Sequence, residues 1–367
     1  MLKKICIVIL ILANISHISA EEISIDSFVK AIDEYTKTED ILNIKEVAKD
    51  LEKGKGIDIK EICGKLVGSL FKEVKIAFKN MYLIFVIVII MSIIKFMQLG
   101  EDDSVKKISY IACTMLISTV CIATFLEILK LFEARVSLLT SMLQVAVPIL
   151  MTLLIVTGGI SSAGIATPLI LFAVQCIGAV VSNIIVPLSI ISLSFNVINS
   201  VNTNINLGSL SKILNKASLW ILGVMLTAFL CVFALETNIS VSIDGVAGKT
   251  LQSASSAVPV VGKFVADSLG AVIGSFVVIK KVAGTLTILV ILSVTMLPVF
   301  KIVSVILMFT LLISISSVVI GEDKKIIGLL EKFLDTYKLL LGVLIGIIVL
   351  FVISLAIIMN LSGNIHM

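Results

Sequence analysis

Apolar residues in this chain gather into blocks that are separated by shorter polar stretches. The blocks are roughly 17–25 residues long, the length that a helix needs to cross a bilayer core of about 30 Å. Because lipid cannot satisfy unpaired backbone groups, such blocks are expected to be helices. The pattern therefore predicts an all-α, polytopic integral membrane protein with about seven to eight transmembrane helices. The blocks lie at about residues 81–98, 108–131, 138–157, 165–194, 217–235, 282–299, 302–320 and 338–360.

Prolines interrupt two of these regions. Pro187 lies in the long fourth block and is expected to bend its helix, since proline lacks a backbone donor and crowds the preceding turn. The sixth and seventh blocks are separated only by residues 298–301, which read Pro-Val-Phe-Lys. A tight hairpin is the preferred interpretation at this point. One broken helix with a re-entrant portion is the alternative.

The first 20 residues resemble a secretory signal peptide. A basic start is followed by a short apolar run from Ile5 to Ala13, and the small residue Ala20 precedes Glu21. Cleavage after Ala20 is the prediction, and an uncleaved first span is the alternative. Residues 21–79 are polar with short amphipathic patterns, which predicts a small helical extracytoplasmic N-terminal domain.

Export of residues 21–79 would set the sidedness of every later loop. Alternating crossings would place four loops in the cytoplasm, at residues 99–107, 158–164, 236–281 and 321–337. These loops and their flanks carry more lysine and arginine than the opposite loops, as the positive-inside rule expects. The predicted order is a signal peptide at 1–20, the N-terminal domain at 21–79, transmembrane helices one to five at 80–235, an amphipathic small-residue-rich segment at 236–281, and transmembrane helices six to eight at 282–367.

Residues 236–281 are neither a clear span nor an ordinary polar loop. Small residues recur every fourth position and would form a ridge that lets another backbone approach closely. A lysine and an aspartate four residues apart lie on the same side and can pair. An interfacial helix, a helix packed in an assembly or lining a water-filled path, and a simple span all remain open. The candidate helix-packing or pore-facing residues are Asp244, Gly248, Gly262, Lys263, Ala266, Asp267, Gly270 and Gly274.

Composition and motifs limit the functions that the chain is expected to have. The 367 residues are 58% hydrophobic and only 15% charged, whereas soluble domains are roughly half apolar and a quarter charged. No P-loop, dinucleotide fingerprint, HExxH motif or nucleophile elbow is present. The two histidines, His17 and His366, lie near the ends, and the six cysteines form no CxxC pair. We expect no enzymatic activity, no cofactor, no metal site and no nucleic-acid partner.

Charged residues near membrane depth are interpreted as snorkelling side chains at span ends. They are Glu127, Lys130, Glu133, Arg135, Glu236 and Lys301.

Several stretches together resemble a known family. They are residues 58–79 leading into the first span, the run Asp-Gly-Val-Ala-Gly-Lys at 244–249, Pro-Val-Val-Gly at 259–262, Asp267, Ile279-Lys280 and the break at 297–301. With the signal peptide, they resemble the stage III sporulation protein AE family, membrane proteins of endospore-forming bacteria. The similarity covers essentially the whole chain, and residues 244–281 are its most specific part.

The resemblance implies a place and partners. Proteins of this family are made in the mother cell and inserted into the mother-cell-derived outer forespore membrane during sporulation. They join the other SpoIIIA-operon membrane proteins and a SpoIIQ-type forespore protein in a complex that resembles a channel, feeding or secretion apparatus. The resemblance places residues 21–79 in the intermembrane space and brings no catalytic residues.

We interpret the chain as a membrane subunit of this sporulation channel complex, embedded in the lipid bilayer. The sequence leaves open whether it forms a homo-oligomer. A stand-alone multi-pass transporter is one alternative and would need a polar site between broken helices. A purely structural scaffold of a membrane complex is the other. The small-residue ridge suits scaffold and channel equally.

Overall fold

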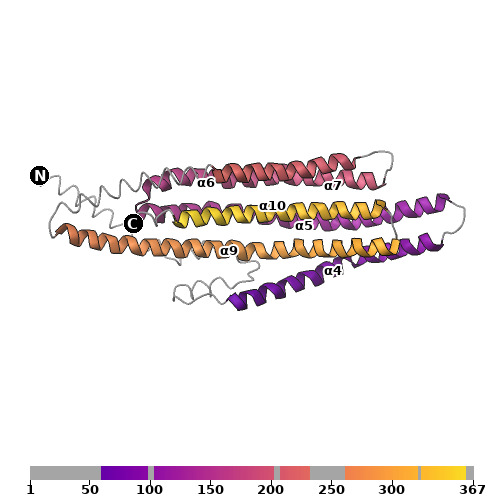
Figure 1. Cartoon of the computed structure of the whole chain (residues 1–367), viewed down its shortest axis with the longest axis horizontal. Coiled ribbons are helices and arrows are strands. Elements are labelled where there is room, and N and C mark those ends of the chain that lie inside the picture. The colour runs from indigo at the N-terminus through magenta and orange to yellow at the C-terminus, as the bar shows by residue number, and fades with distance from the viewer. Residues whose placement is uncertain (1–58, 98–102, 202–206, 232–260, 321–323, 361–367) are drawn as a thin grey trace.

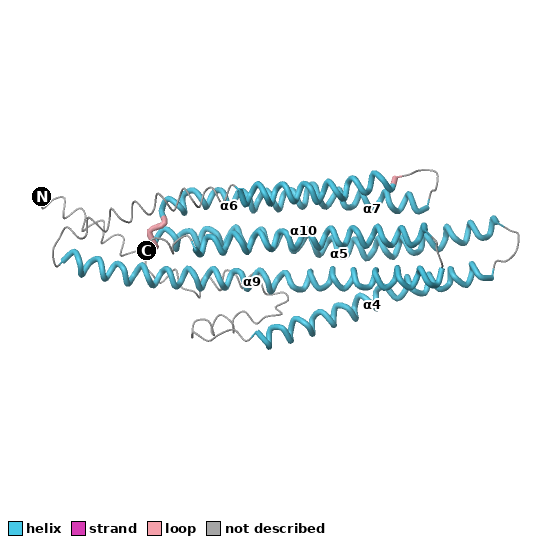
Figure 2. The backbone as a smooth tube through the Cα atoms, in the orientation of Figure 1, coloured by secondary structure: helices cyan, strands magenta, loops and turns pink. Residues whose placement is uncertain are grey.

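The computed structural model describes residues 59–97, 103–201, 207–231, 261–320 and 324–360. Apart from Leu207 and a turn at residues 157–159, this part of the chain is helical (Figures 1 and 2). Six of its helices are long and apolar enough to cross a membrane, so the all-α membrane-protein prediction is confirmed. In chain order the elements are α4 (Ile59–Met97), α5 (Asp103–Val156), α6 (Ile160–Val180), the π-helical turn η2 (Val181–Ile185), α7 (Val186–Val201), a helix over Gly208–Cys231, α9 (Val261–Ile320) and α10 (Lys324–Asn360).

Four of the eight expected spans are joined in pairs. Residues 108–131 and 138–157 both lie on α5, and residues 282–299 and 302–320 both lie on α9. The preferred hairpin at residues 298–301 is therefore wrong, because Pro298 lies inside α9 and the helix continues past it. An interior proline costs about 3 kcal/mol. Packing of the following residues against α4, α5 and α10 offsets that cost.

Continuous α5 and α9 also change the sidedness expected for two loops, since the predicted segment 236–281 runs into the start of α9 and residues 321–337 follow its other end. The two ends of α5 lie at opposite ends of the bundle (Figure 1). The turn that follows Val156 is therefore far from the end at Asp103, whereas the sequence placed residues 99–107 and 158–164 on one side. That placement is wrong, because it required α5 to fold back on itself near residues 132–137.

The N-terminal boundary is also different. The expected break between an extracytoplasmic domain and the first span falls at residues 79/80, but α4 runs through it without interruption. Residues 59–79 of the predicted helical domain are helical, as the first part of α4. The signal peptide and the rest of the N-terminal domain lie outside the described residues.

The long helices are too long for a single bilayer crossing. At about 1.5 Å per residue, the 54 residues of α5 extend about 80 Å and the 60 residues of α9 about 90 Å, against a bilayer core of about 30 Å. Each helix carries two apolar segments of span length with charged residues between them. The bundle consequently has two apolar layers along its long axis.

We name these layers by their segments. Layer A contains 136–156 of α5, 160–180 of α6, 217–231, 282–300 of α9 and 339–359 of α10. Layer B contains 81–94 of α4, 108–126 of α5 and 302–320 of α9. Close contacts align the segments of layer A: a Cβ added at Gly178 would lie 3.0 Å from Thr140 Oγ1, and one added at Gly346 would lie 3.4 Å from Leu222 Cδ2. In layer B, Ser92 Oγ of α4 donates to the Val319 carbonyl near the end of α9 at 2.8 Å.

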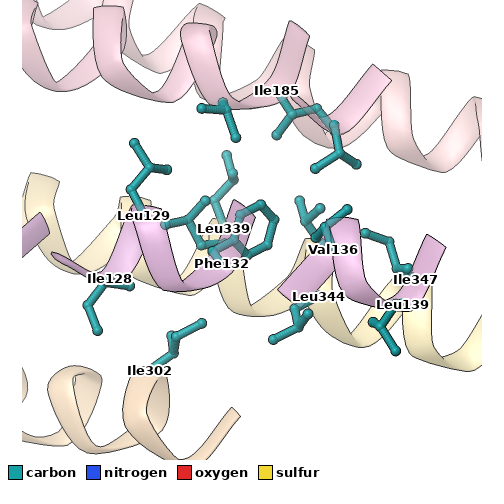
Figure 3. Packing of buried hydrophobic residues seen from close by; sticks show 14 of the residues in the cluster. Ile128, Leu129, Phe132, Val136, Leu139, Ile185, Ile302, Leu339, Leu344 and Ile347 are labelled. Atoms are coloured by element: carbon teal, nitrogen blue, oxygen red, sulfur yellow. The ribbon is translucent and has the colours of Figure 1, made fainter. Parts of the chain in front are cut away.

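Large apolar and aromatic side chains fill the interior between the two layers. Phe132 and Ile128 of α5 are buried against α9 and α10, with Ile302 and Leu339 nearby (Figure 3). Tyr337 of α10 is fully buried, and its ring centroid lies 5.1 Å from that of Phe309 and 6.2 Å from that of Phe125. Aromatic pairs at such distances add packing energy beyond surface burial. The charges between the layers are therefore confined to the outside of the bundle.

The helix from Ile160 to Val201 is distorted just before Pro187. Residues Val181–Ile185 form a π-helical turn, in which the Val186 amide donates to the Val181 carbonyl, five residues back. Proline cannot donate to the carbonyl four residues before it, and its ring crowds that carbonyl. A π-bulge is a common way to absorb such a conflict. The expected effect of Pro187 thus takes the form of a wider turn within a continuous helix.

Two glycines, Gly158 and Gly159, form most of the turn between α5 and α6. Gly158 adopts a φ of 93°, a region that side chains with a Cβ rarely occupy. Thr157 Oγ1 donates to the Leu154 carbonyl at 2.9 Å and closes the end of α5. The chain reverses here within residues 157–159.

Candidate functional site

The small-residue ridge begins at the free end of α9. Asp244 and Gly248 lie outside the described residues. Gly262, Lys263, Ala266, Asp267 and Gly270 lie on α9, with side chains outside the described part, so their pairing stays a prediction. The segment is continuous with the span that follows, since α9 has no break between residues 281 and 282.

The last member of the ridge faces open space. A Cβ added at Gly274 would meet no atom of the described chain within 4 Å. The first part of α9 also extends beyond the ends of α5, α6 and α10 (Figure 1). If the ridge packs closely against a backbone at this level, that backbone belongs to another element or another molecule.

Lys280 is the most buried charged residue of the described chain. Its side chain is fully buried, and Nζ donates to the Ile358 carbonyl of α10 at 3.0 Å. Ile358 belongs to the last turn of α10, where carbonyls lack helical partners and the helix dipole is negative. Lys280 therefore caps α10 from α9. A Cβ at Gly284, one turn further along α9, would collide with Met359, so the two helices approach closely there.

A charged belt separates the two layers. It includes an ion pair between Glu127 Oε1 of α5 and Lys301 Nζ of α9 at 2.7 Å, with side chains 52% and 26% exposed. Glu73 and Asn80 of α4 line the same small hollow, whose volume of about 10 Å³ suits a single water molecule. Glu127 and Lys301 were interpreted as side chains at span ends. The structure instead places them inside long helices and pairs them.

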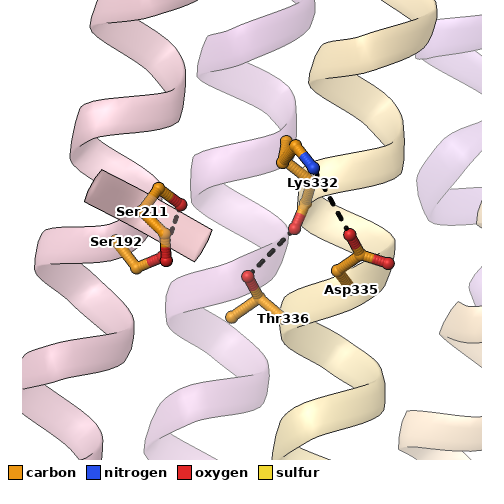
Figure 4. A network of polar contacts seen from close by, with 5 residues as sticks. All are labelled: Ser192, Ser211, Lys332, Asp335 and Thr336. Carbon is orange, nitrogen blue, oxygen red and sulfur yellow. Dashed lines mark hydrogen bonds and ion pairs between the residues drawn. The ribbon is translucent and has the colours of Figure 1, made fainter. Parts of the chain in front are cut away.

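The belt continues onto α10. Lys332 Nζ lies 3.6 Å from Asp335 Oδ2, and Thr336 Oγ1 donates to the Lys332 carbonyl at 2.9 Å (Figure 4). Lys130, Glu133 and Arg135 follow Glu127 on α5. The defined charged belt is Glu73, Glu127, Lys130, Glu133, Arg135, Lys301, Lys332 and Asp335.

A polar seam joins α7 to the Gly208–Cys231 helix. The Ser192 and Ser211 hydroxyls lie 2.7 Å apart and are buried, and Asn199 Oδ1 accepts from the Leu207 amide at 3.1 Å. Figure 4 shows this serine pair between the two helices. Hydroxyl and amide contacts of this kind hold helices together in membranes.

The described residues contain no group of three His, Cys, Asp or Glu side chains that could hold a metal ion. The polar contacts described above join one helix to another. The arrangement can bind neighbouring proteins or border a polar path.

Sequence reasoning missed two features of this site. Lys280 was counted only as a loop charge, although it follows Ile279 in a stretch that carries the family resemblance. The pairing of Glu127 with Lys301, 174 positions apart, leaves no local pattern. Opposite charges at the breaks of two interrupted apolar blocks were the one available signal.

Comparisons with known proteins agree with the architecture. The model of the family described as stage III sporulation protein AE matches residues 42–362. A relative, stage III sporulation protein AE of Bacillus subtilis (strain 168), is 23% identical over 304 residues, which cover 82% of this chain and 75% of the relative. No solved structure matches the chain. Since the family match spans nearly all of the chain, the protein belongs to the stage III sporulation protein AE family.

Proposed function

We propose that this chain is a membrane subunit of the channel complex that links mother cell and forespore during sporulation, without enzymatic activity of its own. Family membership over residues 42–362 is the observation that carries the proposal. The six long apolar helices supply the membrane-embedded body that such a subunit needs. Energy for transport would come from a partner ATPase, since no nucleotide-binding motif occurs in the sequence.

The proposed partners are the other SpoIIIA-operon membrane proteins and a SpoIIQ-type forespore protein, and the proposed location is the outer forespore membrane. The ridge from Gly262 to Gly274 is the proposed contact surface. Its end at Gly274 is uncovered in the described chain, and small residues favour close helix packing in membranes.

Helix continuity favours a complex subunit over a stand-alone transporter. Transporters of the inverted-repeat type place broken helices opposite each other around a central site. Here α5 and α9 pass through the charged belt without a break, and the π-helical turn η2 is the one departure from α geometry within the long described helices. A rocking mechanism around a central binding site therefore has no structural basis in the described part.

The proposal is tested in sporulating cells. A strain lacking the chain should engulf the forespore but produce few heat-resistant spores, and the wild-type chain supplied in trans should restore them. A tagged full-length chain, solubilised from the membranes of these cells, should co-purify with the SpoIIIA-operon and SpoIIQ-type proteins. Normal spore yield without the chain, or purification without these partners, would contradict the proposal.

A further inference from the structure

The outward face of α5 carries polar residues at membrane depth. Between residues 136 and 156, in layer A, its exposed residues are Ser137, Gln144, Pro148 and Thr152, followed at the end of the helix by Ile155 and Val156. The fully buried residues of the same stretch are all valine, leucine, methionine or alanine. A helix whose outer face meets lipid has the opposite arrangement, because polar groups in membranes turn toward protein or water.

The adjoining face of α6 also carries polar residues. Gly164, Pro168, Phe172, Gln175 and Ser182 are exposed, and their spacing places them on one side of the helix. The two helices meet closely beside this face, where a Cβ at Gly178 would lie 3.0 Å from Thr140 Oγ1. We call Ser137, Ser141, Gln144 and Thr152 of α5, with Gln175 and Ser182 from the helix that starts at Ile160, the polar strip.

A hydrogen bond joins the two halves of the strip. Gln144 Nε2 of α5 donates to Gln175 Oε1 of α6 at 2.5 Å, and both side chains are exposed. This bond uses one donor of Gln144 and one acceptor position of Gln175, while each amide offers two donors and two lone pairs. Placing such unused groups in hydrocarbon costs several kcal/mol. Exposure to water would satisfy them.

Other outward faces of layer A are mainly apolar, as expected for contact with lipid, although Thr227 is exposed. Trp220 is 74% exposed, Val224 is 60% exposed and Val349 of α10 is 50% exposed. The strip is therefore a local departure from the surface of its own layer.

From these observations we infer that the polar strip lines a water-filled path through layer A, with the other walls supplied by neighbouring subunits. The inference rests on the proposed function and assigns the face of this chain that borders the conduit. Residues 136–201 contain no Asp, Glu, Lys, Arg or His, so the lining offers only neutral hydroxyl and amide groups. Such a lining suits small polar solutes and does not select strongly by charge.

Cysteine labelling tests the inference on the full chain in membranes of sporulating cells. The six native cysteines are first replaced, and spore formation confirms that this background works. Single cysteines then replace Ser137, Gln144 or Thr152 in the strip, and Val224 or Val349 as exposed controls in the same layer. The probe is a positively charged, membrane-impermeant methanethiosulfonate reagent.

Strip cysteines should react about ten-fold faster than the controls or more, because the reactive thiolate forms in water and not in lipid. Labelling of strip positions no faster than at Val224 would overturn the inference, whether lipid or a docked protein helix covers them. Co-purification of the partners with the same variants reports on the complex separately. Protected strip cysteines in an intact complex would thus refute the path and leave the proposed function standing.

Discussion

Replacing Gly284 with alanine tests how closely α9 and α10 pack at the end of layer A. The added Cβ would collide with Met359 Cγ and lie 2.6 Å from Met359 Sδ. Overpacking of this kind costs about 1–3 kcal/mol. Alanine also gains up to about 1 kcal/mol over glycine in helix propensity. The expected net effect of Gly284→Ala is therefore a loss of about 0–2 kcal/mol.

Gly342→Ala on α10 is the matched control. Gly342 lies in the same layer, and an added Cβ would meet no described atom within 4 Å. This variant should keep the propensity gain without the collision. The difference between the two variants isolates the collision, about 1–3 kcal/mol, which for a chain of this length corresponds to a separation of roughly 1–4 °C in Tm.

The assay is thermal unfolding of the purified full chain in detergent, with both variants and the wild type measured at one scan rate. Met359→Ala removes Cγ, Sδ and Cε, so Gly284→Ala should cost much less in that background, as a double-mutant cycle would reveal. Equal Tm values for Gly284→Ala and Gly342→Ala would refute the close approach of α9 and α10.

Three further changes address the ridge, the helix cap and the belt. Gly270→Leu should block co-purification and spore formation while the protein still inserts into the membrane, because a large side chain prevents close helix packing. The control Val272→Leu adds one methylene and should do little. Normal spore formation by the Gly270→Leu strain would show that the ridge is not a packing surface. Lys280→Met should lower the free energy of unfolding by about 1–3 kcal/mol, because it leaves a C-terminal carbonyl of α10 unpaired. Amide hydrogen exchange in the last turn of α10 should then be faster. Unchanged exchange would mean that the cap is not needed. Glu127→Gln should lower Tm only slightly, since half-exposed ion pairs contribute about 0–1 kcal/mol to stability. A large drop in Tm would show that the ion pair with Lys301 behaves as a buried one.

The candidate site could be predicted only in part from the sequence. Glycine and alanine at every fourth position identify a ridge by simple helical geometry. The polar strip is different, because Ser137, Gln144 and Thr152 are spread through an apolar block and are not distinctive there. Their meaning depends on which side of α5 is covered by other helices, and that requires the packed bundle.

The sequence by itself determined that this protein is a multi-span helical membrane protein of its family. Span length, apolar content and the placement of charges are local properties, and lipid leaves helices as the favoured conformation for such blocks. The turn that follows α5 likewise rests on a local property, because Gly158 adopts a positive φ that glycine tolerates.

Only the tertiary structure decided how many helices these spans form and which faces they bury. A charged stretch such as 127–135, or Pro298 followed by Lys301, is locally compatible with both a hairpin and a continuous helix. Contacts with other helices select the continuous form: Phe132 is buried, and Glu127 pairs with Lys301 on another helix. The residues that stabilise the continuous helix lie far away in the sequence. The local pattern of apolar and polar residues therefore does not identify them.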